Sequence, residues 1–359
     1  MSELLDLGNR GLGGSLVVFA LGAAVILVVG ARTARLVDRL ARHTGMGRGF
    51  AGMLFLGGIV SLTEISTVST ASLAGSPRLA LNNLFGNVSM NLFLLAVVDC
   101  VAGRGAITSF IVHPAMLLQG TLAIVLLSFA TMAMTIGDYP VLGVGLWSSA
   151  LFLLCLGALW MSAVYDRRQV WVARGGPEDG HGAGAVDQAR DADASPGPGG
   201  EKLWPLALRL LGCGLLTLAA GFALAKSGDS LAKQTGLGTS FVGFFLVGMS
   251  TSLPELSTTI PAIRMKRHEM AIGEILGSNL FSLLLIFLAD VVYDGGPVLN
   301  QVGGFEVLAA LLGITMTGIL LVGMIERRDR SFLRMGYDSI AILVLFTAGA
   351  IALYRLSGT

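Results

Sequence analysis

Long apolar stretches, separated by short polar segments, recur along the whole chain. A helix that spans a bilayer needs about 20 mostly apolar residues. Ten stretches meet this length, five on each side of a polar segment at residues 166–202, so the pattern predicts an all-α membrane protein with ten transmembrane helices. The predicted helices cover residues 14–34, 50–74, 79–101, 110–134, 140–164, 204–226, 240–263, 268–291, 302–325 and 337–357.

Two of these regions carry the same polar pattern inside apolar surroundings. One reads VSLTEISTVSTASLAGSPRLALNNLFGNVSMN from Val60 to Asn91, and the other reads MSTSLPELSTTIPAIRMKRHEMAIGEILGSNLFS from Met249 to Ser282. Placing Glu64 on Glu255 fixes a constant sequence offset (255 minus 64), and this offset needs no gap. It pairs Ser61 with Ser252, Gly86 with Gly277, and Asp99 with Asp290.

The helix count predicts how the two copies are oriented. Because each half contains an odd number of helices, the second half enters the membrane from the opposite side, which predicts two inverted five-helix repeats. The first repeat is expected at residues 1–165 and the second at residues 203–359. Residues 166–202 are rich in Gly, Ala, Asp and Pro and are expected to form a flexible linker, too short to fold as a calcium-sensing domain.

Charge patterning predicts the orientation in the membrane. Of the 24 Lys and Arg residues, 18 fall in segments on the side of the central linker. Basic residues favour the cytoplasmic side, so we expect a cell-membrane protein with both termini outside and the linker in the cytoplasm. No basic run with interleaved aromatic residues is present, so nucleic acid is not an expected partner. The lipid bilayer is an expected partner, and we expect the protein to be a monomer.

The second motif combines a carboxylate with several neutral oxygen atoms. A charged side chain within a bilayer is costly, so an unpaired Glu255 there suggests a function. Thr251 and Ser252 lie four and three residues before Glu255, on the same helical face. Pro254 has no N–H to donate, which frees the carbonyl of Ser250. Hard cations such as Ca²⁺ and Na⁺ prefer oxygen ligands of this kind.

The first motif offers fewer hydroxyl groups, since Val60 stands where the second has Thr251, and no proline is present. On the following helix of each half, residues spaced by four form a polar stripe, and Gly86 and Gly277 allow these helices to approach the carboxylates. The stripes consist of Asn83, Asn87 and Asn91 in the first half, and Glu274, Ser278 and Ser282 in the second.

Other acidic residues have competing interpretations. Asp99 and Asp290 lie near predicted helix ends, which favours ordinary interfacial acids exposed to solvent. Glu274 is either an interfacial acid or part of an ion or proton path. A buried ion pair for Glu64 and Glu255 is disfavoured, because no Lys or Arg lies in the middle of a predicted helix.

The two motifs resemble the alpha repeats of the calcium:cation antiporter superfamily, the sodium/calcium exchanger-like membrane proteins. STSLPE and GEILGSNLFS are similar to that family's GTSLPE and GNxxGSNxxN/D, whereas VSLTE and NNLFGNVSMN match more loosely. The resemblance implies that Glu64 and Glu255 are the central ion-binding carboxylates. It implies further ligands in Ser61, Thr251, Ser252, Ser278, Asn91 and the backbone carbonyl of Val60.

Two positions depart from the family pattern. Ser282 stands where relatives often carry Asp or Asn, and Asn87 stands where the first copy should have the serine of GSN. We include both in the predicted metal-binding set. These changes bear on the sodium sites, and so on the counter-ion, more than on the divalent site.

The leading functional hypothesis is a secondary antiporter that exchanges Ca²⁺ for Na⁺ by alternating access, with the first and sixth helices sliding across the core. Exchange of Ca²⁺ or another divalent cation for H⁺ is the alternative, supported by Ser282 and Glu274. A membrane-embedded enzyme is disfavoured because the histidines are scattered and no HExxH or paired-carboxylate enzyme motif appears. A passive channel is a further alternative. No cofactor is expected, and the transported ions are the substrates.

Overall fold

The computed structural model describes residues 12–44, 52–73, 75–102, 107–110, 114–141, 143–167, 203–235, 244–245, 248–326, 331–332 and 335–357, which are almost entirely helical. Within this part, eight helices are long and apolar enough to cross a membrane, and Trp204–Ala220 forms a shorter apolar helix. The all-helical membrane class predicted from the sequence is therefore confirmed. The predicted linker lies outside the described residues, apart from its first two positions, which extend the preceding helix to Arg167.

The first half begins with one long helix and continues with a helix that is interrupted near its middle. Its elements are α2 (Leu12–Thr44), the π-helix η2 (Gly52–Gly57), α4 (Gly58–Val60), α5 (Leu62–Leu73), α6 (Pro77–Ala102), the 3₁₀ helix η3 (Ile107–Phe110), α7 (Pro114–Ile136), the antiparallel pair β1 (Pro140–Val141) and β2 (Val144–Gly145), and α8 (Leu146–Arg167).

The second half repeats this order. Its elements are α10 (Leu203–Thr235), α12 (Gly248–Thr251), α13 (Leu253–Arg264), α14 (His268–Val292), the 3₁₀ helix η5 (Val298–Asn300), α15 (Gly304–Glu326), the antiparallel pair β3 (Ser331–Phe332) and β4 (Met335–Gly336), and α16 (Tyr337–Ser357). The bounds of α10, α13, β3 and β4 follow those of α2, α5, β1 and β2 by the same offset that separates Glu255 from Glu64.

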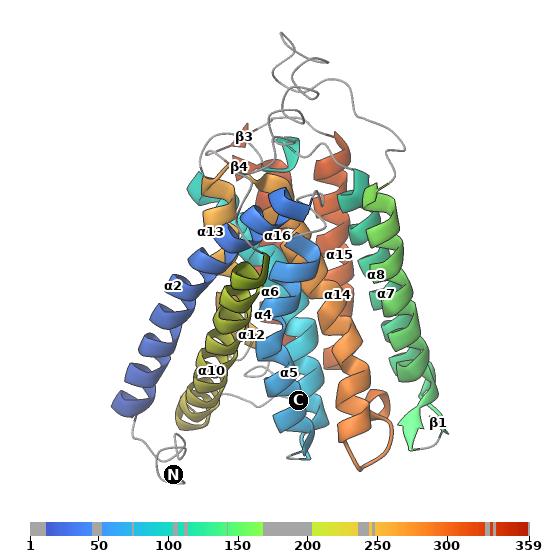
Figure 1. The fold of residues 1–359 in the computed structure, drawn as a ribbon. Helices are drawn as coiled ribbons and strands as arrows, with labels where there is room; N and C mark the ends of the chain where they lie inside the picture. Colours follow the sequence, from blue (N-terminus) through green and yellow to red (C-terminus); the bar gives the residue numbers. More distant parts are fainter. Residues whose placement is uncertain are drawn as a thin grey trace.

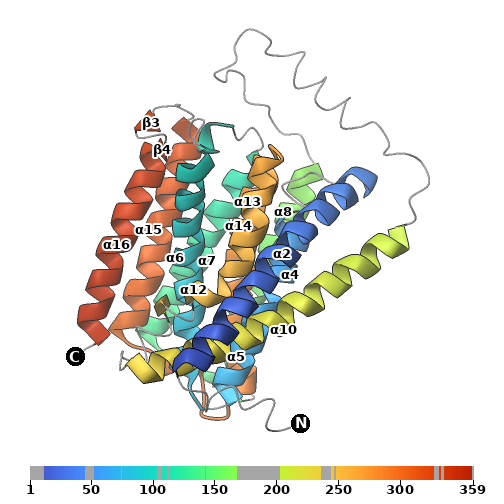
Figure 2. The same cartoon turned by 90° about the vertical axis from the view of Figure 1, so that its left-hand side faces the viewer.

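The offset found in the sequence is thus also the offset between matching elements. α2 and α10 contact each other along their length and run in opposite directions on one side of the bundle (Figures 1 and 2). The start of α2 and the end of α16 lie at one end of the bundle, whereas the end of α8 and the start of α10 lie at the other (Figure 1). The turn between α13 and α14 lies at this second end (Figure 2).

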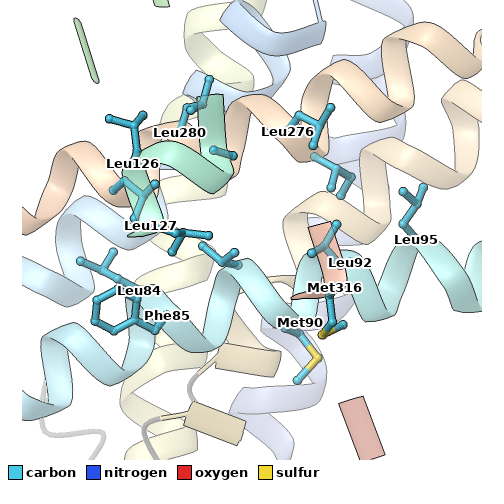
Figure 3. Packing of buried hydrophobic residues seen from close by; sticks show 14 of the residues in the cluster. Leu84, Phe85, Met90, Leu92, Leu95, Leu126, Leu127, Leu276, Leu280 and Met316 are labelled. Carbon is cyan, nitrogen blue, oxygen red and sulfur yellow. The ribbon is translucent and has the colours of Figure 1, made fainter. Parts of the chain in front are cut away.

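α6 and α14 form the centre of the bundle. Their apolar side chains pack with those of α7 and α15, as Figure 3 shows for Leu92, Leu127, Leu276 and Met316. Among the spans, α6 has the largest buried share of its apolar window. A helix that is surrounded by protein can carry polar residues without exposing them to lipid, and α6 and α14 carry both predicted polar stripes.

Two glycines allow close backbone contacts with these central helices. A Cβ at Gly86 would lie 2.6 Å from the carbonyl oxygen of Phe244, and one at Gly277 would lie 2.7 Å from the Cα of Met53. Met53 and Phe244 are themselves related by the repeat offset. The prediction that Gly86 and Gly277 permit close helix approach is therefore confirmed, and the approaching segments precede the two interrupted helices.

The expectation that Asp99 and Asp290 are solvent-exposed interfacial acids is wrong. Both are about 1% exposed, and each accepts hydrogen bonds from backbone N–H groups of connecting segments. Asp99 accepts from Ile107 at 2.8 Å in its own half and from Gly336 at 3.0 Å in the other. The bonds of Asp290 are equivalent, because its donors occupy the matching positions of the two halves.

Asp290 accepts from Val298 at 2.7 Å in its own half and from Gly145 at 2.6 Å in the first half. The hydroxyl of Ser148 also contacts this carboxylate. Each aspartate therefore holds a connecting segment of its own half and a short strand of the other. These bonds join the halves at opposite ends of the bundle, near β3–β4 and β1–β2 (Figure 1).

Candidate cation site

Each of the two central glutamates lies in the first turn of a helix that starts inside the bundle. Glu64 follows an interruption at Ser61, between α4 and α5, and Glu255 follows one at Ser252, between α12 and α13. The positive end of a helix dipole favours negative charge in its first turn. The interruptions therefore place both carboxylates where backbone N–H groups partly compensate their charge.

Glu64 contacts residues of both halves. The hydroxyl of Ser282, on α14, lies 2.9 and 2.8 Å from the two carboxylate oxygens of Glu64. The side-chain amide of Asn87, on α6, donates to the Oε1 atom of the same carboxylate. The carboxylate of the first half is thus bound by a residue of the second, which brings the two motifs together in the centre of the bundle.

Glu255 lies on the other side of the same asparagine. Its Oε1 atom accepts a hydrogen bond from Ser278 at 3.0 Å and one from the amide of Asn87 at 3.5 Å. Ser252 donates its hydroxyl to the amide oxygen of Asn87. Asn87 therefore bridges the two carboxylates, while the Oε2 atom of Glu255 has no hydrogen-bond partner in the described part of the chain.

Asn91 extends this network by one helical turn along α6. Its amide nitrogen lies 3.0 Å from the Oδ1 atom of Asn279 and 3.5 Å from the hydroxyl oxygen of Ser278. Its own Oδ1 atom has no hydrogen-bond partner among the described residues. Such a buried oxygen, next to Ser278 and thus close to Glu255, is available as a cation ligand.

Besides Ser252, three residues of the predicted set lie at the helix interruptions. Ser61 and Val60 are buried, and the Val60 carbonyl accepts a hydrogen bond from the Thr63 hydroxyl at 2.9 Å. The Thr251 hydroxyl lies 3.1 Å from the side-chain amide oxygen of Asn83, a residue of the first half. The other seven, which hydrogen bonds join in one network, are Glu64, Glu255, Ser252, Asn87, Asn91, Ser278 and Ser282.

The charge of this cluster has no counterpart in the surrounding protein. Among the described residues, no Lys, Arg or His side chain is buried, and no group of three His, Cys, Asp or Glu residues forms a metal centre. A bound cation would therefore contact two carboxylates together with hydroxyl and amide oxygens. Two negative charges balance one divalent cation, or two monovalent cations or protons.

The sequence left the partners of four polar residues undetermined. Asn279 accepts from Asn91, and its place in the GSN motif was the available signal. Glu274 is fully buried, so its interpretation as an interfacial acid is wrong. Thr258 and Thr259 direct their hydroxyl groups to Glu274, and nothing in their sequence spacing distinguished this role from helix packing.

The fold and this site define a multi-pass membrane protein with a buried, oxygen-lined, anionic centre shared between two halves. A model of the family described as "Sodium/calcium exchanger protein" matches residues 14–164 and 205–355, so it accounts for most of the chain. The chain belongs to this family. The two matched segments are related by the same offset as the two glutamates.

Curated relatives and solved structures agree with this assignment. The chain is 26% identical over 260 residues to inner membrane protein YrbG of Escherichia coli, covering 72% of this chain and 74% of that protein. It is 30% identical over 141 residues to sodium/calcium exchanger MaX1 of Methanosarcina acetivorans, covering 38% and 39%. Its fold is similar to that of the sodium-calcium exchanger NCX_Mj, with a TM-score of 0.61 at 20% identity, covering 94% and 97%.

Proposed function

We propose that the protein exchanges Ca²⁺ for Na⁺ across the cell membrane by alternating access. Membership of the sodium/calcium exchanger family supports cation antiport. The observation that carries the proposal is the position of Asn87 between Glu64 and Glu255, which gathers two buried carboxylates around one amide without a basic residue beside them. Two uncompensated negative charges favour a divalent cation, or monovalent ions in its place, and competition for one site is the basis of exchange.

The ions are held, in this proposal, by Glu64, Glu255, Ser61, Val60, Thr251, Ser252, Asn87, Asn91, Ser278 and Ser282. The carboxylates supply charge, and the hydroxyl, amide and carbonyl oxygens replace water around the dehydrated ion. The ions are substrates, and the protein needs no cofactor and catalyses no chemical reaction.

The proposed architecture has ten spans in two inverted repeats. The repeated element bounds and the opposite directions of α2 and α10 support it. In such a frame α2 and α10 slide as a pair across the core, and the termini lie outside with the linker in the cytoplasm. We expect each monomer to hold a complete site, because all ten proposed ligands belong to one chain.

The test is flux of radioactive Ca²⁺ into proteoliposomes, with Na⁺, K⁺ and H⁺ gradients imposed in turn. Wild-type protein is expected to take up Ca²⁺ when an outward Na⁺ gradient drives the exchange. Glu64→Gln and Glu255→Gln each remove one charge at nearly constant volume and are expected to abolish uptake. If both variants retain exchange, the site assignment is wrong, and if Ca²⁺ flux needs no counter-ion, the protein is a channel.

Exchange for H⁺ is the second candidate. It is favoured by the neutral Ser282 at a position where family members often carry an acid, and by the buried carboxylate of Glu274. In the same proteoliposomes, a pH gradient without Na⁺ would then drive Ca²⁺ uptake, whereas a Na⁺ gradient at equal pH would not.

A further inference from the structure

Glu274 is a third fully buried glutamate, and the proposed exchange site does not use it. It lies on α14 four residues before Ser278, which is one helical turn, or about 6 Å, closer to the turn between α13 and α14. The hydroxyl of Thr258 contacts its Oε1 atom, and the hydroxyl of Thr259 lies 3.3 Å from its Oε2 atom. All three side chains are at most 1% exposed.

The hydroxyl of Thr258 has three possible acceptors. It lies 3.1 Å from the carbonyl oxygen of Pro254 and 2.9 Å from that of Glu255, besides its contact with Glu274. A hydroxyl carries one hydrogen and can satisfy one of these three acceptors at a time. When this hydroxyl donates to one of the helix carbonyls, the Oε1 atom of Glu274 remains available as a cation ligand.

The charge of Glu274 has no opposite charge nearby to balance it. No basic side chain is buried in the described part of the chain, and the ionisable group whose charge acts on Glu274 there is Glu255, another carboxylate. An unpaired buried anion costs several kcal/mol, so it is neutralised by binding a cation or a proton. A single carboxylate among neutral hydroxyls is balanced by one positive charge, whereas a divalent ion would leave an excess charge behind.

We propose that Glu274, Thr258 and Thr259 form a second site that holds one monovalent cation, either Na⁺ or a proton. This inference rests on the proposed function as a cation antiporter, and it adds a binding place between the Glu64–Glu255 centre and the end of the bundle at which α13 turns into α14. By the predicted orientation, that end is the cytoplasmic one.

The site has no equivalent in the first half. The matching positions there hold Asn83, Thr67 and Val68, so the carboxylate and one hydroxyl are missing. Asn83 accepts from Thr251, and Thr67 donates to the carbonyl of Thr63 at 3.0 Å. The two otherwise matching halves thus differ by one negative charge, which makes the two ends of the ion path unequal.

The experiment measures how many Na⁺ ions or protons the purified full-length protein binds. Equilibrium binding of radioactive Na⁺ is measured at alkaline pH without Ca²⁺, and infrared difference spectra record the carbonyl band of protonated carboxyl groups as pH is changed. If Na⁺ occupies the site, Glu274→Gln binds one Na⁺ fewer at saturation. If a proton occupies it, Na⁺ binding is unchanged and the variant loses one protonated-carboxyl band.

Two further variants separate the site from the fold. Thr259→Val keeps the carboxylate and the side-chain volume, and is expected to weaken Na⁺ binding severalfold or to shift the pH at which the infrared band disappears. It carries the test if Glu274→Gln does not fold. Thr67→Val, at the position matching Thr258, is the control and should alter neither measurement.

The inference is overturned if Glu274→Gln, or Thr259→Val in its place, leaves both the Na⁺ count and the infrared band unchanged. Ca²⁺ flux through Glu255→Gln is measured in parallel. If that variant is inactive while Glu274→Gln matches the wild type in both binding measurements, only the second site is disproved. If Glu255→Gln transports normally, the proposed function itself fails.

Discussion

Ser282 and Asn87 show how two neutral residues organise two charged ones. Ser282 donates to Glu64 from the opposite half, and Asn87 reaches both carboxylates from α6. Hydrogen bonds to charged groups contribute about 1.5–3 kcal/mol each, which is small against the cost of burying two like charges without a cation. These residues therefore position the carboxylates, while a cation or protons must provide the compensating charge.

Ser282→Asp adds a third carboxylate beside Glu64. Without a cation the added charge should repel the existing pair and lower the melting temperature, and bound Ca²⁺ should relieve that repulsion. We expect a larger Ca²⁺-induced rise in melting temperature than in the wild type, because a ligand that binds the folded state more tightly stabilises it more. Thermal unfolding in detergent at mildly alkaline pH, with and without Ca²⁺, measures this difference.

Ser282→Asn supplies the control for size, since asparagine matches aspartate in volume without its charge. It adds a similar volume at this buried position and should show no enlarged response to Ca²⁺. A Ser282→Asp protein whose melting temperature no longer responds to Ca²⁺ would mean that this position does not face the divalent ion.

At the scale of helices, the two interruptions occupy matching places in the repeat but differ in local sequence. In the second half, Pro254 lies two residues after the break at Ser252 and removes a backbone donor. In the first half the break at Ser61 occurs without proline, after a π-helical turn at Gly52–Gly57. The same structure thus arises from two local sequences, and the close packing of α14 against η2 accompanies the first-half break.

Gly277→Ala tests this packing. The added methyl group would lie 2.7 Å from the Cα of Met53 and 2.8 Å from its carbonyl oxygen, and backbone atoms cannot move aside as a side chain can. We expect strongly reduced Ca²⁺ flux and a destabilisation of about 1–3 kcal/mol from overpacking. Flux in proteoliposomes, normalised to the amount of folded protein, and thermal unfolding measure the two effects.

Gly157→Ala is the matched change on α8, where an added Cβ meets nothing within 4 Å. Because alanine favours helix more than glycine does, this variant should be as stable as the wild type or slightly more stable. Equal behaviour of Gly157→Ala and Gly277→Ala would contradict the role given to the close contact with Met53.

The sequence predicted those features that depend on local pattern. Apolar length gave the membrane class, and the shared polar pattern around Glu64 and Glu255 gave the repeat offset that the element bounds reproduce. The break at Ser61 was not predictable from the local pattern, because no proline accompanies it. The burial of Glu274 could not be inferred either, since it depends on how α13 packs on α14 and brings Thr258 and Thr259 beside it.

At the scale of the whole molecule, Asp99 and Asp290 join the two halves. Each binds a backbone N–H of the other half, Gly336 and Gly145 respectively, at opposite ends of the bundle. The arrangement is reciprocal because Asp99 and Asp290 occupy matching positions of the two repeats, and so do Gly145 and Gly336. The central site of Glu64 and Glu255 therefore lies between these two connections, one at each end of the bundle.

Asp99→Asn and Asp290→Asn each replace a carboxylate that accepts two backbone hydrogen bonds by an amide whose NH₂ group faces a donor. We expect each to lower the free energy of unfolding by about 2–4 kcal/mol. The double variant should show the sum, because effects at distant sites are additive. Asp294→Asn, an exposed acid in the segment after α14, is the control and should change stability by less than about 0.5 kcal/mol.

Denaturant titration in detergent provides these stabilities, and Ca²⁺ flux per folded protein gives a second measurement. Because neither aspartate contacts the central site, the folded single variants should keep the wild-type apparent affinity for Ca²⁺. A double variant no less stable than either single one would show that the two connections act as a single unit rather than as independent ones. Loss of Ca²⁺ affinity in folded Asp290→Asn would instead show that the relative position of the two halves sets the geometry of the carboxylate pair.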